Sequence, residues 1–157
     1  MKKRCIIPIL VFSLLLGGLS ACSVSKNGGF AEYDLKLLAE DIVESEAFSD
    51  ILTEVSQDIA KSLYGYGAED VIEGRLLCST GATTEEIGLF KCRDKEAASR
   101  VLEKAEARIV TQGNIYESYA PEEIPKLNNA VCKAEGNYVF YIVSTDSKSV
   151  KQVLESY

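Results

Sequence analysis

Four residues near the N-terminus, Leu19-Ser20-Ala21-Cys22, have the types and spacing that covalent lipid attachment requires. The Cys22 thiol can carry a lipid on its sulfur, and the small residue before it lets a peptidase cut there. Three basic residues at positions 2–4 precede an apolar core over residues 6–16, which is the order of an export signal. The core is shorter than the roughly 20 apolar residues that span a bilayer. The sequence therefore predicts a lipoprotein signal peptide over residues 1–21 and lipidation at Cys22. The alternatives are an ordinary signal peptide with an incidental cysteine and an uncleaved anchor.

The predicted anchor also predicts where the rest of the chain resides. A single acyl chain holds a protein at a bilayer only marginally, so stable attachment requires a diacylated cysteine, with palmitate as a typical acyl group. The expected location is the cell membrane, lipid-anchored on its extracytoplasmic face. Membrane lipid, bound through Cys22, is the first expected partner.

Acidic pairs are the other residues whose spacing could support chemistry. Glu85-Glu86 and Glu122-Glu123 could supply a general acid and a general base, or hold a divalent cation. Neighbouring residues on a strand point to opposite faces, however, so Glu85 and Glu86 should not share one site. Solvated surface charge is the simpler interpretation of both pairs.

Enzyme signatures are otherwise scarce. The chain has no histidine, so no catalytic triad or Cys-His pair and no histidine-ligated metal site can form. Ser23 and Lys26 match a spacing in which lysine can activate serine, but they lie in the predicted linker and lack partner motifs. No catalytic, cofactor-binding or metal-binding residue is predicted.

Four tyrosines are the best candidates for contacts with a partner. Each is expected at the end of an element or in a loop, where its ring could stack on a sugar or an apolar peptide. The alternative is that the rings close the ends of the hydrophobic core and leave their hydroxyls in water. The four candidates are Tyr64, Tyr66, Tyr116 and Tyr119.

Charge and cysteine content limit the remaining possibilities. Residues 1–21 hold three of the 17 basic residues and none of the 24 acidic residues, so residues 22–157 have a formal net charge of −10. An acidic domain repels phosphate backbones, and nucleic acid is therefore not expected as a partner. Beyond the signal and Cys22, three cysteines remain: Cys78, Cys92 and Cys132. They can form at most one internal disulfide, and buried free thiols are the favoured interpretation.

Composition and periodicity divide the exported part into a linker and a single domain. Residues 22–32 comprise the lipidated cysteine and a short linker rich in serine and glycine, and residues 33–157 are long enough for one α+β domain with its own core. Helical spacing of apolar residues predicts a first helix with Leu35, Leu38, Ala39 and Ile42 on its buried face. A second helix is predicted after Ser49, with Leu52, Val55, Ile59 and Leu63 as its stripe.

Two strand-strand-helix units are predicted after these two N-terminal helices. The first has strands over 71–79 and 85–92 and a helix that Asp94 caps and that ends near Gly113-Asn114. A short helix starts at Pro121. The second unit has strands over 130–134 and 138–144 and a helix capped by Asp146. An offset of 52 residues superposes Asp94 on Asp146, Ile87 on Val139 and Phe90 on Ile142, which suggests an internal duplication.

These units predict an α+β fold in which a four-stranded, mostly antiparallel sheet is packed with helices. The strand over residues 138–143 is apolar on both faces and should therefore be central and covered on both sides. The helices that follow the two hairpins should cover one face. The N-terminal helix pair is favoured for the other face, and a partner is the alternative.

Several short segments together resemble an uncharacterised lipoprotein family of Gram-positive bacteria that carries a domain of unknown function. They are the segment ending in Cys22 and residues 85–91, 119–121, 126–131 and 136–139, and the resemblance covers roughly residues 33–157. The resemblance implies an exported, anchored α+β domain. It implies no substrate and no catalytic residue.

The sequence favours a binding or structural module of the cell envelope over an enzyme. Its expected partner is another envelope protein or a cell-wall component, and the sequence sets no oligomeric state. The alternative is a small envelope enzyme that uses paired carboxylates, for example on cell-wall glycan. Two carboxylates in a deep cleft, about 5 to 9.5 Å apart as in glycosidases, would favour that alternative.

Overall fold

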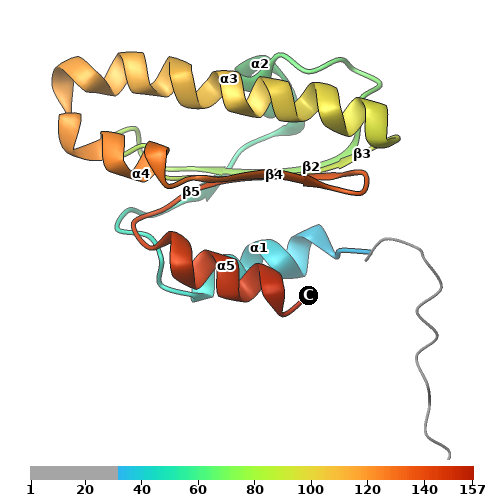
Figure 1. Cartoon of the computed structure of the whole chain (residues 1–157), viewed down its shortest axis with the longest axis horizontal. Helices are drawn as coiled ribbons and strands as arrows, with labels where there is room; N and C mark the ends of the chain where they lie inside the picture. The colour runs from blue at the N-terminus through green and yellow to red at the C-terminus, as the bar shows by residue number, and fades with distance from the viewer. Residues whose placement is uncertain (1–31) are drawn as a thin grey trace, which may run out of the picture.

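An antiparallel sheet lies between two layers of helices in the computed structural model, which describes residues 32–157 (Figure 1). The sheet has five strands in the order β1-β2-β3-β5-β4. The strands are β1 (Thr53–Glu54), β2 (Val71–Cys78), β3 (Glu86–Cys92), β4 (Val131–Glu135) and β5 (Tyr138–Val143). The helices are α1 (Leu35–Glu44), α2 (Gln57–Tyr64), α3 (Lys95–Tyr119), the 3₁₀ turn η1 (Pro121–Glu123), α4 (Ile124–Asn128) and α5 (Ser147–Glu155). Figure 1 shows α2, α3 and α4 on one side of the sheet and α1 and α5 on the other.

Strand β5 is the centre of the fold, as its apolar sequence predicts. All six of its residues are buried, and it pairs with β3 on one side and β4 on the other. Its side chains alternate between two cores: Tyr138, Phe140 and Ile142 lie on the α1/α5 side, and Val139, Tyr141 and Val143 on the α2/α3 side. A strand covered on both faces needs no polar alternation, and this explains why none is present.

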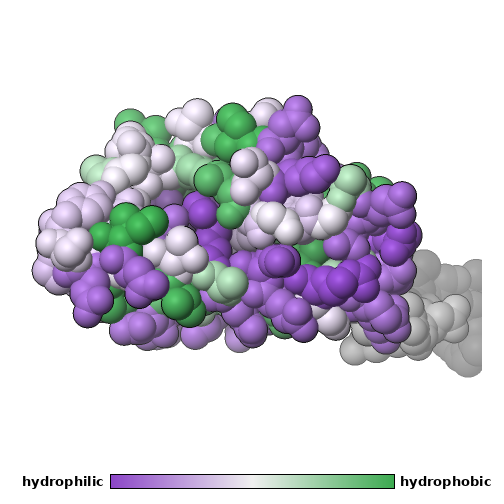
Figure 2. Space-filling view, turned by 90° about the horizontal axis from the view of Figure 1, so that it is seen from above, coloured by the Kyte–Doolittle hydropathy of each residue, from purple (hydrophilic) through white to green (hydrophobic). Residues whose placement is uncertain are grey.

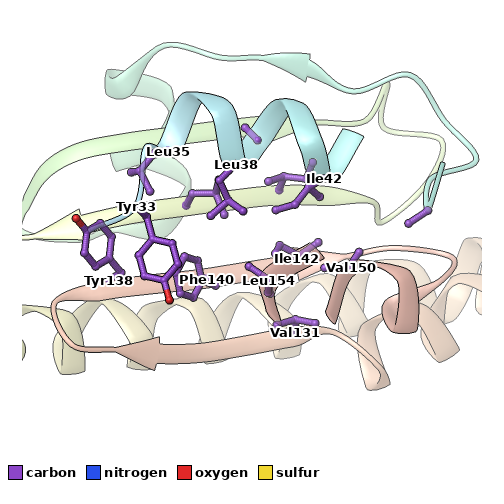
Figure 3. Packing of buried hydrophobic residues seen from close by; sticks show 14 residues of the cluster. Tyr33, Leu35, Leu38, Ile42, Val131, Tyr138, Phe140, Ile142, Val150 and Leu154 are labelled. Atoms are coloured by element: carbon purple, nitrogen blue, oxygen red, sulfur yellow. The ribbon is translucent and has the colours of Figure 1, made fainter. Parts of the chain in front are cut away.

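The core under α1 and α5 is closed at one end by aromatic rings. The ring of Tyr33 meets those of Tyr138 and Phe140 edge to face, with centroids 5.0 and 5.1 Å apart. Figure 3 shows Leu38 and Ile42 of α1 directed to the same layer as Val150 and Leu154 of α5. The buried face of α1 is the one that its spacing predicts, namely Leu35, Leu38, Ala39 and Ile42.

Side-chain caps fix where the helices begin. The Asp94 carboxylate accepts a hydrogen bond from the backbone N–H of Ala97 and begins α3, and Asp146 accepts from Lys148 and Ser149 to begin α5. Both caps satisfy N–H groups that have no partner inside their helix, and both agree with the sequence prediction.

The prediction of two N-terminal helices followed by a four-stranded sheet is wrong. The described residues form a fifth strand, β1, where the second helix was expected to begin. The backbone N–H of Val55 donates to the carbonyl of Leu76, and Thr53 and Glu54 pair with the end of β2. Helix α2 consequently begins only at Gln57, with Ser56 as its cap. It buries Ala60 and Tyr64, whereas two residues of the predicted stripe, Ile59 and Leu63, stay half exposed.

The predicted distribution of helices over the two faces is also wrong. The two N-terminal helices lie on opposite faces, with α1 beside α5 and α2 beside α3 (Figure 1). The helices that follow the two hairpins, α3 and α5, are likewise separated by the sheet. The residue pairs matched by the 52-residue offset therefore point in opposite directions: Ile87 lies on the α1/α5 side and Val139 on the α2/α3 side. This geometry does not support the suggested duplication.

Helix α3 continues past Gly113 and Asn114, where the sequence predicts its end. Glycine inside a helix costs about 0.5 to 1 kcal/mol relative to alanine. The last turns offset this cost through Tyr116, which is buried and donates hydrogen bonds to the carbonyls of Gly81 and Thr83 in the β2–β3 turn. Packing on a distant turn thus outweighs a local stop signal.

Candidate functional site

The predicted lipidation site, Cys22, lies outside the described residues. Within residues 32–157, no helix has both the length and the apolar character that crossing a membrane would require.

The four candidate tyrosines fall into two pairs at different places. Tyr64 and Tyr66 are buried, and their rings meet Phe90 on the α2/α3 face with centroids 5.0 and 5.6 Å apart. Burial raises the pKa of both hydroxyls, and the Glu86 charge raises that of Tyr64 further. These two rings pack in the core, so neither is placed to stack on a partner.

The second pair lies where α3 ends. The Tyr116 and Tyr119 rings are 5.0 Å apart, and both hydroxyls donate to the carbonyl of Gly81. Tyr116 is buried, whereas Tyr119 is 58 % exposed. Of the four candidates, only Tyr119 presents its ring to solvent.

Glu85 and Glu86 have different partners and do not share one site, as their adjacency predicts. Glu85 accepts hydrogen bonds from the backbone N–H groups of Ser49 and Asp50 and from the hydroxyl of Thr145. Burial raises the pKa of the Glu85 carboxyl, but the hydrogen bonds from Thr145, Ser49 and Asp50 outweigh it and lower the pKa to about 2. A carboxyl held ionised in this way cannot act as a general acid near neutral pH.

Glu86 forms a buried ion pair with Arg108 of α3. The Arg108 Nε lies 2.7 Å from Glu86 Oε1, and its Nη2 bonds the other carboxylate oxygen. The Tyr64 hydroxyl donates to Glu86 Oε1 at 2.6 Å. The Glu86 and Arg108 side chains are only 6 % and 10 % exposed, so the pair is largely removed from water. One residue beside the pair, Tyr141, has a buried hydroxyl with no hydrogen-bond partner among the described residues.

The second acidic pair is also divided. Glu122 is exposed, whereas Glu123 is buried and accepts hydrogen bonds from the backbone N–H and the hydroxyl of Thr84. The Lys126 ammonium lies between two carboxylates, 2.9 Å from Glu123 and 3.0 Å from Glu85. Both carboxylates are therefore within about 6 Å of each other, but the Lys126 ammonium occupies the space between them. These ion pairs anchor α4 to the end of the sheet.

The thiols of Cys78, Cys92 and Cys132 are all free. Burial raises the pKa of Cys78 and Cys92 to about 12 and that of Cys132 to about 11. The thiolate form, which is the nucleophile, is therefore suppressed at neutral pH. This result agrees with the predicted packing role of the three residues.

A groove along the outer side of α1 has a volume of about 320 Å³. Its apolar part is formed by Ala39 and Val43 of α1 and by Leu52 and Leu77 from the β1–β2 edge. Its charged rim consists of Lys36, Glu40, Glu44, Glu54 and Arg75. The groove can receive an apolar segment whose flanks carry charge.

The sequence analysis did not find this groove. Its α1 residues, Lys36 through Glu44, recur at spacings of three and four, so they do form one helical face beside the predicted core face. Leu77 lies in β2, a strand that the sequence does predict, whereas Leu52 directly precedes β1, in a segment predicted as a helix. The groove therefore needs the pairing of β1 with β2, which no local pattern indicates.

Searches with this chain find no match among curated proteins and none among solved structures. A family model described as "Domain of unknown function (DUF4358)" matches residues 45–144, nearly two thirds of the chain. The matched segment contains all five strands together with α2, α3 and α4, and it stops short of α1 and α5. This match confirms the expected domain of unknown function, and the chain belongs to the DUF4358 domain family.

Proposed function

We propose that this protein is an extracytoplasmic lipoprotein of a Gram-positive bacterium, anchored through Cys22, and that it binds a segment of another envelope protein. The observation that carries the binding role is the groove along α1, with its apolar floor and charged rim. The anchor rests on the basic start, the apolar core and the small residues before Cys22.

The position of the domain's N-terminal end is compatible with a tether. The described chain starts beside the C-terminus, where the Tyr33 ring lies against that of Tyr157 (Figure 1). Nine residues separate Cys22 from Glu32, a span of roughly 35 Å when fully extended. The domain would therefore stay close to the bilayer, with α1 and its groove within reach of other membrane-associated proteins.

The charges around the groove favour a partner with basic side chains. Arg75 binds both oxygens of Glu54, and Lys36 lies 3.8 Å from Glu40, so both rim cations already have acidic neighbours. Glu44 has no cation within ion-pair distance in the described part of the chain. The rim is thus negative overall, in a domain whose residues 22–157 carry a net charge of −10. An apolar segment flanked by Lys or Arg complements this surface.

Site-specific crosslinking in the native organism tests the binding role. A photoreactive residue at Val43 lines the groove, whereas one at Leu37, which is also about half exposed on α1, does not. We expect a defined crosslink from position 43, none from position 37, and loss of the crosslink in Glu44→Lys, which reverses the rim charge. Mass spectrometry of the crosslinked peptide should identify an envelope protein segment with apolar and basic residues.

Equal crosslinking from both positions, or a crosslink unaffected by Glu44→Lys, would count against a groove-specific partner. The alternative of a carboxylate enzyme has weaker support, because the buried carboxylates of Glu85, Glu86 and Glu123 are engaged by Lys126, Arg108 and backbone donors.

A further inference from the structure

A second hollow, of about 210 Å³, opens between α2 and α3 on the opposite side of the sheet from the groove. It is lined by Leu63 and Tyr64 of α2 and by Lys104, Ala107, Arg108 and Thr111 of α3. Figure 2 views this side of the molecule, where apolar side chains lie in separate groups among hydrophilic ones. The hollow is smaller than the roughly 300 to 1,000 Å³ of most drug-sized ligand pockets, so it suits a small ligand or a single side group.

The guanidinium of Arg108 is held in one orientation at this hollow. Two of its nitrogens, Nε and Nη2, bond the Glu86 carboxylate, and the Tyr64 ring lies beside it with 5.2 Å between the guanidinium carbon and the ring centroid. The third nitrogen, Nη1, donates to no acceptor among residues 32–157. Because the side chain is 10 % exposed and lines the hollow, a preoriented donor is available to a ligand there.

Lys104 adds an uncompensated positive charge. It lies one helical turn before Arg108 on α3, is exposed, and forms no ion pair with a carboxylate in the part of the chain described. The Arg108 charge is balanced by Glu86, so the positive charge at the hollow comes from Lys104. The neighbouring acids on α3, Glu103 and Glu106, do not line the hollow. An acidic domain thus contains one small basic recess.

Part of the wall of the recess is apolar. Leu63 is 44 % exposed, and it stands with the Tyr64 ring and the Ala107 methyl group around the two cationic groups. A planar carboxylate can accept from Arg108 Nη1 and from the Lys104 ammonium while its hydrocarbon part contacts these walls. Inorganic phosphate would satisfy the donors but leave the apolar walls without a partner.

We propose that this recess binds a small organic carboxylate, with Lys104 and the Nη1 group of Arg108 as its donors and Leu63 as its apolar contact. The ligand chemistry is an aliphatic carboxylate, whether of a free acid or of a peptide C-terminus. This site is separate from the groove along α1 and does not depend on the proposed function.

Titration of the full-length protein with hexanoate, followed by NMR, tests the proposal. We expect saturable shifts at the backbone signals of residues 63–64 and 104–111, and at least about tenfold weaker binding of phosphate. N-acetyl-glycyl-leucine and its C-terminal amide form the second arm. Tighter binding of the peptide acid than of hexanoate assigns a peptide C-terminus, the reverse assigns a free acid, and binding of the amide as tightly as the acid overturns the carboxylate assignment.

Two pairs of variants separate the site from a general charge effect, and all four changed residues are exposed, so folding should be retained. Lys104→Gln should weaken hexanoate binding about tenfold, whereas Lys151→Gln on α5, with the same loss of charge, should not change it. Leu63→Ala should weaken hexanoate but not phosphate, whereas Ile59→Ala, one turn earlier on α2, should affect neither. Equal effects within either pair, or no saturable shift at these residues, would overturn the proposal.

Discussion

The hydroxyl of Tyr64 occupies the space that Gly88 leaves empty on the α2/α3 face of the sheet. A Cβ added to residue 88 would lie 2.7 Å from that oxygen and 3.1 Å from the Phe90 ring. Because residue 88 of β3 has no side chain, the Tyr64 hydroxyl can lie over β3 and donate its hydrogen bond to Glu86. This glycine serves a close approach between side chain and backbone rather than an unusual backbone angle.

Gly88→Ala should lower the free energy of unfolding by about 1 to 3 kcal/mol, because the new methyl group displaces the Tyr64 ring from Glu86 and cannot move Phe90 aside. Urea denaturation measures the change. Gly113→Ala is the matched control: a Cβ there meets nothing within 4 Å inside α3, so it should stabilise the protein by about 0.5 to 1 kcal/mol. A silent Gly88→Ala would show that Tyr64 can move at no cost.

Removing one member of the buried ion pair should be costly. Glu86→Gln leaves the Arg108 charge buried without its counter-charge, and we expect a loss of about 3 to 5 kcal/mol in the free energy of unfolding. Glu54→Gln breaks the pair with Arg75 at the surface, where the Glu54 side chain is 48 % exposed, and should cost less than about 1 kcal/mol. Denaturant melts of the two variants measure the difference, and similar losses would contradict the assigned burial.

Glu85 should make stability depend on pH at the acid end. Its pKa is about 2 in the folded protein against 4.5 ordinarily, so its stabilisation is complete above about pH 4.5 and is lost as the pH falls towards 2. The full shift corresponds to about 3 kcal/mol. The difference in unfolding free energy between the wild type and Glu85→Gln should therefore shrink between pH 5 and pH 2. A difference that stays constant over this range would contradict the lowered pKa.

Phe140 and Tyr141 test whether both faces of β5 are structural. Both side chains are fully buried, Phe140 in the α1/α5 core and Tyr141 in the α2/α3 core. Each change to alanine should cost about 3 to 5 kcal/mol in urea melts, through lost burial and a residual cavity. Val110→Ala, at a residue 63 % exposed on α3, should stay within about 0.5 kcal/mol. A small loss for one of the two core variants would mean that its face is not closed.

Cys22→Ser tests the proposed anchor. The change removes the thiol at the processing junction, so lipid attachment and the cleavage before residue 22 should both fail. Membrane fractionation and mass spectrometry of the mature N-terminus measure the two events. Cys132→Ser, in β4, is the control and should leave both unchanged. An unmodified wild-type chain that begins elsewhere than at Cys22 would refute the lipoprotein proposal.

The sequence alone determines the features that depend on neighbouring residues. The buried face of α1 follows from apolar spacing, and the starts of α3 and α5 follow from Asp94 and Asp146, because a capping carboxylate acts on N–H groups two or three residues away. The central place of β5 follows from its unbroken apolar run. Each of these signals lies within about ten residues of the feature that it specifies.

Tertiary structure decides the features that couple distant segments. Glu85 holds the backbone of Ser49 and Asp50, and the following residues pair with β2, so a segment with helical spacing becomes strand β1. Tyr64 turns into the core because residue 88, on another element, has no side chain. The groove along α1 needs Leu77 of β2, and the recess at Arg108 lies between residues 63–64 of α2 and residues 104–111 of α3. Periodicity describes one element at a time, so sequence patterns specify the parts of this fold, whereas packing between the parts creates its candidate sites.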